Sequence, residues 1–188
     1  MSFYPLLMQT LGILAIVGAI AGIGLLGAHL TPGGRRAVVR RFSGQALDLV
    51  GWAGIVAFVA TSGSLYLSEI IGFTPCVLCW YQRIAMYPLV AIGAVAVLAR
   101  DPGAWRYGLP LAVIGAAIAL YHVVLQYQPA LDVVSCDAGA PCTARYVLVF
   151  GYISIPGLAL GAFLLIIGLM VAAGTVLRAE REGPAPTA

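Results

Sequence analysis

Five long apolar runs dominate the sequence and decide what the chain can fold into. We place them at residues 6–30, 47–71, 79–99, 107–125 and 152–177. Each is close to or above the roughly 20 residues that an α-helix needs to cross the hydrocarbon core of a bilayer. Only 9% of the residues are charged, against about a quarter in a soluble domain. The sequence therefore predicts an all-α integral membrane protein with five transmembrane helices.

The first apolar run has a rival interpretation as a cleaved signal peptide. Signal peptides begin with a basic segment, and their apolar stretch is only about 7–15 residues long. Residues 1–30 contain no Asp, Glu, Lys or Arg, and their apolar run is longer than that. We therefore expect a transmembrane helix at 6–30, followed by a helix breaker at 31–34.

The arginines indicate how the helices are oriented. With five spans, one side of the membrane receives eight of the ten basic residues, namely Arg35, Arg36, Arg40, Arg41, Arg100, Arg106, Arg178 and Arg181. Positive charge gathers on the cytoplasmic side, so we expect the amino terminus outside and the carboxyl terminus inside. The net charge of +3 is then a signal of topology. We therefore expect the protein to contact membrane lipid and to bind no nucleic acid.

Four cysteines fall on the predicted outer side. Thr74 is a suitable N-cap and Pro75 a suitable first residue for a helix, which would put Cys76 in the first turn and Cys79 three residues on. Arg83 follows one turn later, near the same helical face. The positive end of the helix dipole and a guanidinium both lower a cysteine pKa. This pattern predicts thiol–disulfide chemistry at a membrane surface.

The second cysteine pair, Cys136 and Cys142, lies in the longest polar segment, residues 126–145. Two structural disulfides would also explain four cysteines in an oxidising compartment. A zinc ion held by four thiolates is a further alternative, although the spacing of the second pair is unusual for zinc. Closely spaced pairs suit a disulfide that is made and broken, and we favour that interpretation while these alternatives stay open.

Residues 75–89, Pro-Cys-Val-Leu-Cys-Trp-Tyr-Gln-Arg-Ile-Ala-Met-Tyr-Pro-Leu, resemble the signature of the BdbC type within the DsbB/BdbC family of bacterial disulfide-forming membrane proteins. Residues 64–69, 121–126 and 151–160 resemble the same family. The resemblance covers about residues 45–177. It implies a four-helix transmembrane bundle there, preceded by an extra transmembrane helix and basic loop at 1–44. We expect a disordered cytoplasmic tail at 178–188.

The resemblance also implies a function in the bacterial cytoplasmic membrane. Family members reoxidise a thioredoxin-like partner outside that membrane and pass the electrons to a quinone, either ubiquinone or menaquinone. By motif, Cys76 and Cys79 are the pair beside the quinone, with Cys79 as the thiolate that faces it. Cys136 is implied as the site of the mixed disulfide with the partner, and Cys142 as the resolving cysteine. The intervening loop is expected to be flexible enough to swing Cys142 toward Cys76.

Three further residues are candidates for binding the quinone. The resemblance implies that Arg83 stabilises the Cys79 thiolate and a quinone oxygen, although arginines at helix ends also snorkel to lipid phosphates. His122 is expected to line the quinone pocket, while most such histidines satisfy a contact between helices. Glu69 is expected to pair with Arg83 or to handle protons. No metal ligand is predicted.

A vitamin K epoxide reductase-like protein is the alternative enzyme, since it also couples a membrane Cys-x-x-Cys to a quinone. In that family the quinone-side pair follows the loop cysteines, whereas here Cys76 and Cys79 come first. The order of the cysteines therefore favours the DsbB type. A non-enzymatic membrane protein with structural disulfides or zinc is the alternative from a different class.

Overall fold

The computed structural model of the chain describes residues 3–132, 134, 136 and 140–182. Five helices are long and apolar enough to cross a membrane. They are α1 (Phe3–Ala28), α3 (Ala46–Leu65), α4 (Val77–Ala99), α5 (Trp105–Tyr127) and α6 (Ile155–Glu182). The prediction of an all-α protein with five spans is confirmed, because the described residues contain no named strand.

Short helices connect the long ones. α2 (Pro32–Phe42) joins α1 to α3, and the π-helical turn η1 (Tyr66–Ile70) continues α3. The 3₁₀ turns η2 (Pro102–Ala104) and η3 (Pro129–Leu131) precede and follow α5.

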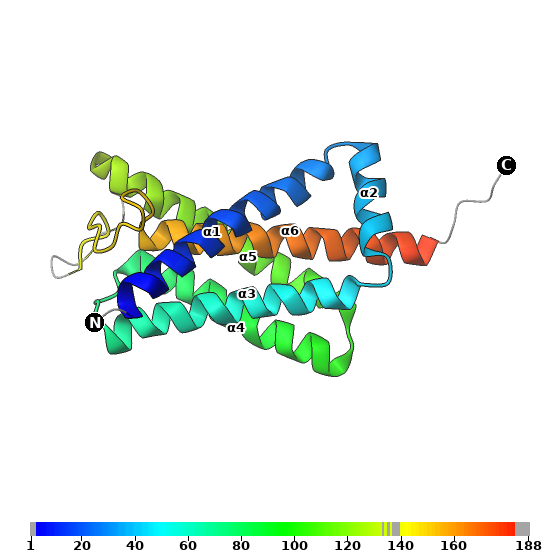
Figure 1. Cartoon of the computed structure of the whole chain (residues 1–188), viewed down its shortest axis with the longest axis horizontal. Helices are drawn as coiled ribbons and strands as arrows, with labels where there is room; N and C mark the ends of the chain where they lie inside the picture. Colours follow the sequence, from blue (N-terminus) through cyan, green and yellow to red (C-terminus); the bar gives the residue numbers. More distant parts are fainter. Residues whose placement is uncertain (1–2, 133, 135, 137–139, 183–188) are drawn as a thin grey trace.

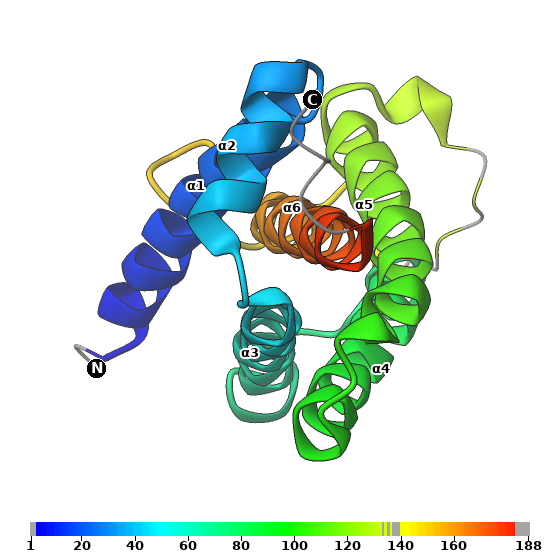
Figure 2. The ribbon, with the colours of Figure 1, turned by 90° about the vertical axis from the view of Figure 1, so that its right-hand side faces the viewer.

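Helices α3 to α6 form the predicted four-helix bundle. α3 packs against α4 and α6, and α5 also packs against α4 and α6. The first helix, α1, lies outside this bundle and crosses α6 obliquely, as Figure 1 shows. Seen along the bundle, α6 therefore has α1, α3 and α5 around it (Figure 2).

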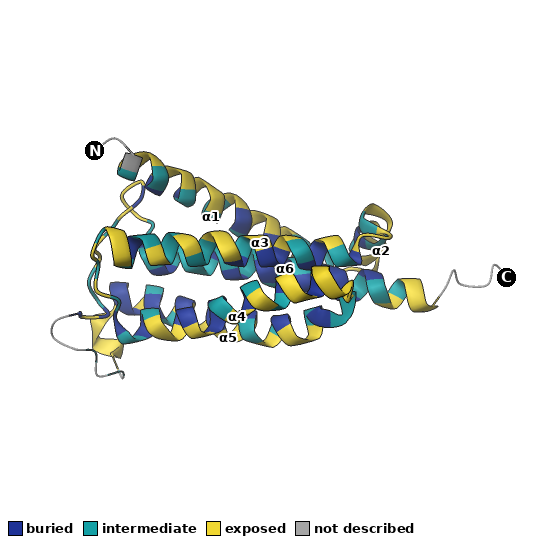
Figure 3. Cartoon of the chain, turned by 90° about the horizontal axis from the view of Figure 1, so that it is seen from below, coloured by how far each residue is buried: buried dark blue, intermediate teal, exposed yellow. Residues whose placement is uncertain are grey.

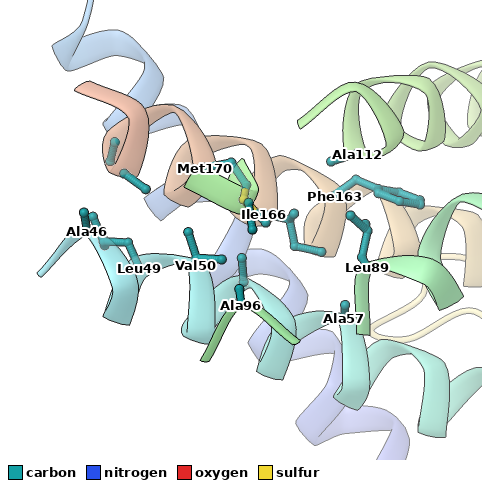
Figure 4. Close-up of a cluster of buried hydrophobic side chains, with 14 of the residues drawn as sticks. Ala46, Leu49, Val50, Ala57, Leu89, Ala96, Ala112, Phe163, Ile166 and Met170 are labelled. Atoms are coloured by element: carbon teal, nitrogen blue, oxygen red, sulfur yellow. The ribbon is translucent and has the colours of Figure 1, made fainter. Parts of the chain in front are cut away.

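The core of the bundle is built from small and medium apolar side chains. Leu89, Phe163 and Ile166 are almost completely buried, and they interdigitate with Val50, Met170 and several alanines, as Figure 4 shows. α3 and α4 approach closely where Gly54 faces Gly93, since a Cβ atom on Gly54 would come within 2.9 Å of the Gly93 Cα. Exposed residues lie along the outer faces of the helices (Figure 3). Many of them are large and apolar, as expected of helices that face lipid.

The two ends of the bundle carry different chemistry. Both cysteine pairs lie at the end where α4 begins and where the α5–α6 connection runs. The basic helix α2, the α4–α5 connection and the end of α6 lie at the opposite end (Figure 1). This separation is the one that the arginine distribution predicts, while the direction of the molecule in the membrane stays a prediction.

The chain does break between two helices here, since α1 ends at Ala28 and Thr31 is extended, but residues 32–34 of the expected breaker begin helix α2. The Thr31 hydroxyl caps the helix by accepting a hydrogen bond of 3.0 Å from the Gly34 N–H, and Pro32 occupies the first turn. Proline is well suited to that position, where its missing N–H is not needed. The glycines therefore stand inside a helix that the cap and the proline start.

The predicted disordered tail is wrong for residues 178–182, which continue α6 to Glu182. Two contacts hold this last turn to the bundle. The Arg178 guanidinium lies 5.4 Å from the Trp105 ring centre, and Glu180 Oε1 accepts a 2.7 Å hydrogen bond from the Gly44 N–H. Residues 183–188 lie outside the described residues.

Candidate functional site

The Cys76–Cys79 pair starts helix α4. Cys76 itself is the N-cap, in an extended conformation, and its Sγ accepts a hydrogen bond of 3.4 Å from the Cys79 N–H. The expectation that Thr74 caps the helix and that Cys76 lies in its first turn is therefore wrong by two residues. The Cys76 sulfur, and not the Thr74 hydroxyl, is therefore the side-chain acceptor at this helix start. Both sulfurs still lie at the positive end of the helix dipole.

Cys76 and Cys79 are free thiols whose sulfur atoms lie 3.0 Å apart. Hydrogen bonding with the Cys79 side chain lowers the pKa of the Cys76 thiol well below its ordinary value, and burial opposes this effect. The nearby His122, whose Nε2 is 3.7 Å from the Cys76 Sγ, acts in the same direction as Cys79. Both of these contacts favour the thiolate form of Cys76.

The other two cysteines form a disulfide, Cys136–Cys142. Cys142 is 1% exposed, whereas Cys136 is only partly buried. Cys142, Cys76 and Leu125 belong to one buried cluster, against which Cys79 and Cys136 pack. The structure thus brings all four predicted cysteines together. We expected the loop between these cysteines to be flexible. Its residues 137–139 lie outside the described residues.

His122 of α5 connects the two pairs. Its Nε2 lies 3.0 Å from the Cys142 carbonyl oxygen, and its Nδ1 lies 2.9 Å from the Gln82 Nε2. A carbonyl oxygen can only accept a hydrogen bond, so Nε2 of His122 carries a hydrogen atom. In the neutral ring Nδ1 then accepts from the Gln82 amide, which fixes the tautomer. His122, 2% exposed, thereby presents an N–H to the Cys76 sulfur.

Arg83 is buried inside the bundle and does not snorkel to the surface. Its Nε donates to the Ser64 hydroxyl at 3.0 Å, and its Nη2 donates to the Ser64 carbonyl at 2.9 Å. The guanidinium carbon lies 5.2 Å from the Trp80 ring centre. Ser64 is therefore the partner of Arg83, where we expected Glu69. It holds the Arg83 guanidinium one helical turn beyond Cys79.

Glu69 is not brought to the site. The residue is exposed on η1, and its Oε1 accepts a hydrogen bond of 2.9 Å from the Ser68 hydroxyl. No hydrogen bond or ion pair joins it to Arg83 in the part of the chain that the structure describes.

A cavity of about 310 Å³ opens beside Cys79 and Arg83. Its walls come from α1, α3, α4 and α6, and most of its lining is apolar. Two buried hydroxyls in this lining, Thr61 Oγ1 and Tyr87 OH, have no hydrogen-bond partner among the described residues. Buried polar atoms are nearly always paired. The two hydroxyls are therefore available to a polar atom of a water molecule or a ligand.

A second cavity of about 60 Å³ lies on the other side of the cysteine pair. Cys76, His122 and Arg145 line this small cavity but not the large one. Cys79 and Arg83 line both. His122 therefore lines the small cavity beside the loop disulfide and not the large one, and its expected place beside a quinone stays a prediction.

Sequence reasoning gave no role to Gln82 and Ser64, and it left Tyr87 open between an aromatic belt at the membrane interface and a contact to the cofactor. One signal for Tyr87 was available, because Cys79, Arg83 and Tyr87 follow each other at intervals of four residues on one face of a helix. Gln82 and Ser64 gave a weaker signal, as single polar residues in apolar runs. Their partners lie on neighbouring helices, and the sequence does not show how these helices are rotated.

The geometry does not suit the zinc alternative. A site of four thiolates is not formed, because Cys136 and Cys142 are joined to each other. The ligand atoms of Cys76, Cys79 and His122 do lie within 4.8 Å of one another. However, Nε2 of His122 donates to a carbonyl and Nδ1 accepts from Gln82, so neither nitrogen offers a free lone pair to a metal ion.

Comparison with known proteins shows the family of the chain. Residues 44–173 match the family model described as Disulfide bond formation protein DsbB. The chain is 50% identical over 117 residues to Disulfide bond formation protein C of Bacillus subtilis (strain 168), which covers 62% of this chain and 85% of that protein. It is 40% identical over 134 residues to a Probable disulfide formation protein of Metapseudomonas resinovorans, which covers 69% of this chain and 91% of that protein. No solved structure was found to match.

The matched segment contains α3, α4, α5 and most of α6 with all four cysteines, and it begins after α1 and α2. The family, the five apolar helices and the adjacent cysteine pairs together identify a disulfide-forming oxidoreductase of the membrane. This chain belongs to the DsbB family of disulfide bond formation proteins.

Proposed function

We propose that this protein is a thiol:quinone oxidoreductase that reoxidises a thioredoxin-like partner outside the bacterial cytoplasmic membrane. Electrons run from the partner through Cys136–Cys142 to Cys76–Cys79 and on to a quinone, either ubiquinone or menaquinone. The observation that carries the proposal is the position of Cys79, which lies between the loop disulfide and a large apolar cavity that also contains a buried guanidinium.

The first step is an exchange at the loop disulfide. A thiolate of the partner attacks Cys136, because Cys142 is buried and Cys136 is accessible. The attack forms a mixed disulfide and releases Cys142 as a thiolate. The second cysteine of the partner then attacks the sulfur of the partner's first cysteine, which is bonded to Cys136. The partner leaves with a disulfide, and Cys136 is released as a thiolate.

The second step transfers the electrons between the two pairs. The Cys142 thiolate attacks Cys76 of an oxidised Cys76–Cys79 pair, with which it shares a buried cluster. This releases Cys79 as the thiolate that faces the large cavity. Cys136 then attacks Cys142 and restores the loop disulfide, which leaves Cys76 and Cys79 reduced. The N–H of His122, 3.7 Å from Cys76, stabilises negative charge on that sulfur.

The large cavity fits a quinone in both shape and donors. Its lining is mostly apolar, as ligand pockets of this kind usually are. The Arg83 guanidinium holds Ser64 with part of its N–H groups, and the rest are available to a quinone oxygen. A quinone bound here would accept the two electrons that Cys76 and Cys79 give up as they close their disulfide, together with two protons, and would leave as the hydroquinone.

A reconstituted reaction tests the proposal. The purified protein is mixed in detergent with a reduced thioredoxin-like dithiol protein and a soluble quinone, and the quinone absorbance is followed. We expect turnover by the wild type and none by Cys79→Ser or by Cys136→Ser. Turnover that persists in Cys136→Ser would contradict the two-pair relay. If no quinone is reduced with any dithiol, the proposal is wrong and the cysteines are structural.

A further inference from the structure

The first helix, α1, lies outside the family match and still reaches the candidate site. Leu11, Leu14, Ala15 and Gly18 of α1 line the same cavity as Cys79 and Arg83. We propose that α1 is the wall of the acceptor site that holds the apolar, polyprenyl tail of the quinone. This inference rests on the proposed function and gives the extra helix a part in binding the acceptor.

Close packing fixes α1 against α6. A Cβ atom on Gly22 would lie 2.3 Å from the Leu164 carbonyl oxygen, and one on Gly161 would lie 2.5 Å from the Ala15 carbonyl oxygen. Such contacts let two helix backbones touch, as small residues commonly do in membranes. Directly after the end of α1, the His29 Nε2 lies 3.0 Å from the Thr175 Oγ1 of α6. The helix is therefore a fixed part of the fold and can shape a binding site.

The cavity is much longer than a quinone ring. Along α3 its lining extends from Trp52 to Ser64, which corresponds to about 18 Å of helix. The ring has to lie near Cys79 to accept electrons, and Cys79 is at the Ser64 end because Arg83 binds Ser64. The remaining length, toward Trp52, is available to a tail.

The chemistry of the walls also differs from one side of the cavity to the other. The unpartnered hydroxyls of Thr61 and Tyr87, the Arg83 guanidinium and the Cys79 thiol come from α3 and α4. The lining residues of α1 have no polar side chain. An apolar wall opposite a polar stripe suits a molecule with a polar ring and an aliphatic tail. The competing occupant is an acyl chain of a membrane lipid.

Two neighbouring residues of α1 provide a matched test. Leu14 is 54% exposed and lines the cavity, whereas Ile13 is 53% exposed and lies outside the lining of that cavity. We compare Leu14→Phe with Ile13→Phe in the full-length protein, because both substitutions enlarge a half-exposed apolar side chain. Two quinones with the same ring are used, one with a polyprenyl tail and one without.

Binding is measured without turnover, through quenching of tryptophan fluorescence by the oxidised quinone. Trp52 lines the cavity and serves as the reporter. We expect Leu14→Phe to raise the dissociation constant of the tailed quinone several-fold, to leave that of the tailless quinone unchanged, and to raise KM in parallel. The expected change in the dissociation constant is modest, because the tail leaves lipid for a wall that is equally apolar. Ile13→Phe should match the wild type for both quinones.

Each other result has one meaning. Equal binding of the tailed quinone by wild type and Leu14→Phe, with normal reduction of both quinones, overturns the role of α1 and leaves the proposed function intact. Equal losses for tailed and tailless quinone also overturn it, because they show a disturbed ring site. Failure of the wild type to bind or reduce either quinone overturns the proposed function, and the inference with it.

Discussion

The Nε2 atom of His122 lies 3.0 Å from the carbonyl oxygen of Cys142, so a transmembrane helix holds the loop disulfide directly. The same nitrogen is 3.7 Å from the Cys76 sulfur. One imidazole therefore touches both the cysteine that we expect to attack and the cysteine that we expect to be attacked. Its position suggests that it controls transfer between the two pairs and has little influence on exchange with the partner.

We expect His122→Phe to slow transfer between the pairs about 10–100-fold, since a hydrogen bond to a charged group is worth about 1.5–3 kcal/mol. Reaction of the partner with Cys136 should stay near the wild-type rate. The two steps can be separated by acid quenching at short times, followed by alkylation and mass analysis of the disulfides. Gln82→Leu should act in the same direction and add little in the double variant, because Gln82 contacts the same ring. Fully additive effects would contradict this arrangement.

Cys76 should carry a thiolate at a pH where ordinary cysteines are protonated. Its hydrogen bond with Cys79, aided by His122 and opposed by burial, lowers its pKa to about 4. The thiolate is present above that pKa and disappears as the pH falls through it. A protein with Cys136→Ser and Cys142→Ser should therefore keep its ultraviolet thiolate absorbance at pH 6. Adding Cys79→Ala should move the midpoint to higher pH, and an unchanged midpoint would show that Cys79 is not the cause.

Arg83→Gln should lower kcat/KM for the quinone about a hundredfold, in the range seen when one donor to a developing negative charge is removed. Exchange of the partner with the loop disulfide should not change, because Arg83 lies beyond Cys79. Ser64→Ala is the matched test of positioning. It removes one of the two Ser64 contacts and leaves the backbone carbonyl, so the loss should be several-fold only. A Ser64→Ala loss as large as that of Arg83→Gln would contradict this ranking.

The fold could be predicted from the sequence because bilayer thickness limits what long apolar runs can do. Five such runs gave five helices, and the breaks between them fell near the observed helix ends. α2 escaped prediction because it is short, basic and glycine-rich at its start. Its helix depends on the Thr31 cap and on Pro32, features that the run of glycines obscured.

The site could be predicted only in part. Cysteine and arginine spacing along α4 pointed to thiol chemistry, because residues of one helix have a known relation to each other. The partner of Arg83 was wrongly expected to be Glu69, on the basis of opposite charge. In the structure the partner is Ser64. Residues 64 and 69 are five positions apart, so they point in different directions around the helix, and Ser64 is the one that faces α4. Such relations between helices depend on packing, which one sequence does not reveal.

The orientation in the membrane can be tested with two exposed positions at opposite ends of the bundle. In a background with the four cysteines changed to Ser, Gln128→Cys lies after α5 and Ser43→Cys lies between α2 and α3. We expect a membrane-impermeant maleimide to label Gln128→Cys in intact cells and Ser43→Cys only after permeabilisation. The reverse pattern would place the cysteine pairs in the reducing cytoplasm. The proposed export of oxidising equivalents to an outer partner would then be wrong.

Tyr87→Phe should separate ligand binding from stability. The Tyr87 hydroxyl is buried without a partner among the described residues, and such a group costs free energy in the unliganded protein. Its removal should therefore leave the Tm of the quinone-free protein unchanged or slightly higher. If the hydroxyl binds a quinone oxygen, KM for the quinone should rise about 2–10-fold, the value of one neutral hydrogen bond. Tyr107→Phe, an exposed tyrosine on α5 that lines neither of the two site cavities, is the control. A lower Tm with unchanged KM would show that the Tyr87 hydroxyl is structural, and the polar stripe of the cavity would then end at Arg83.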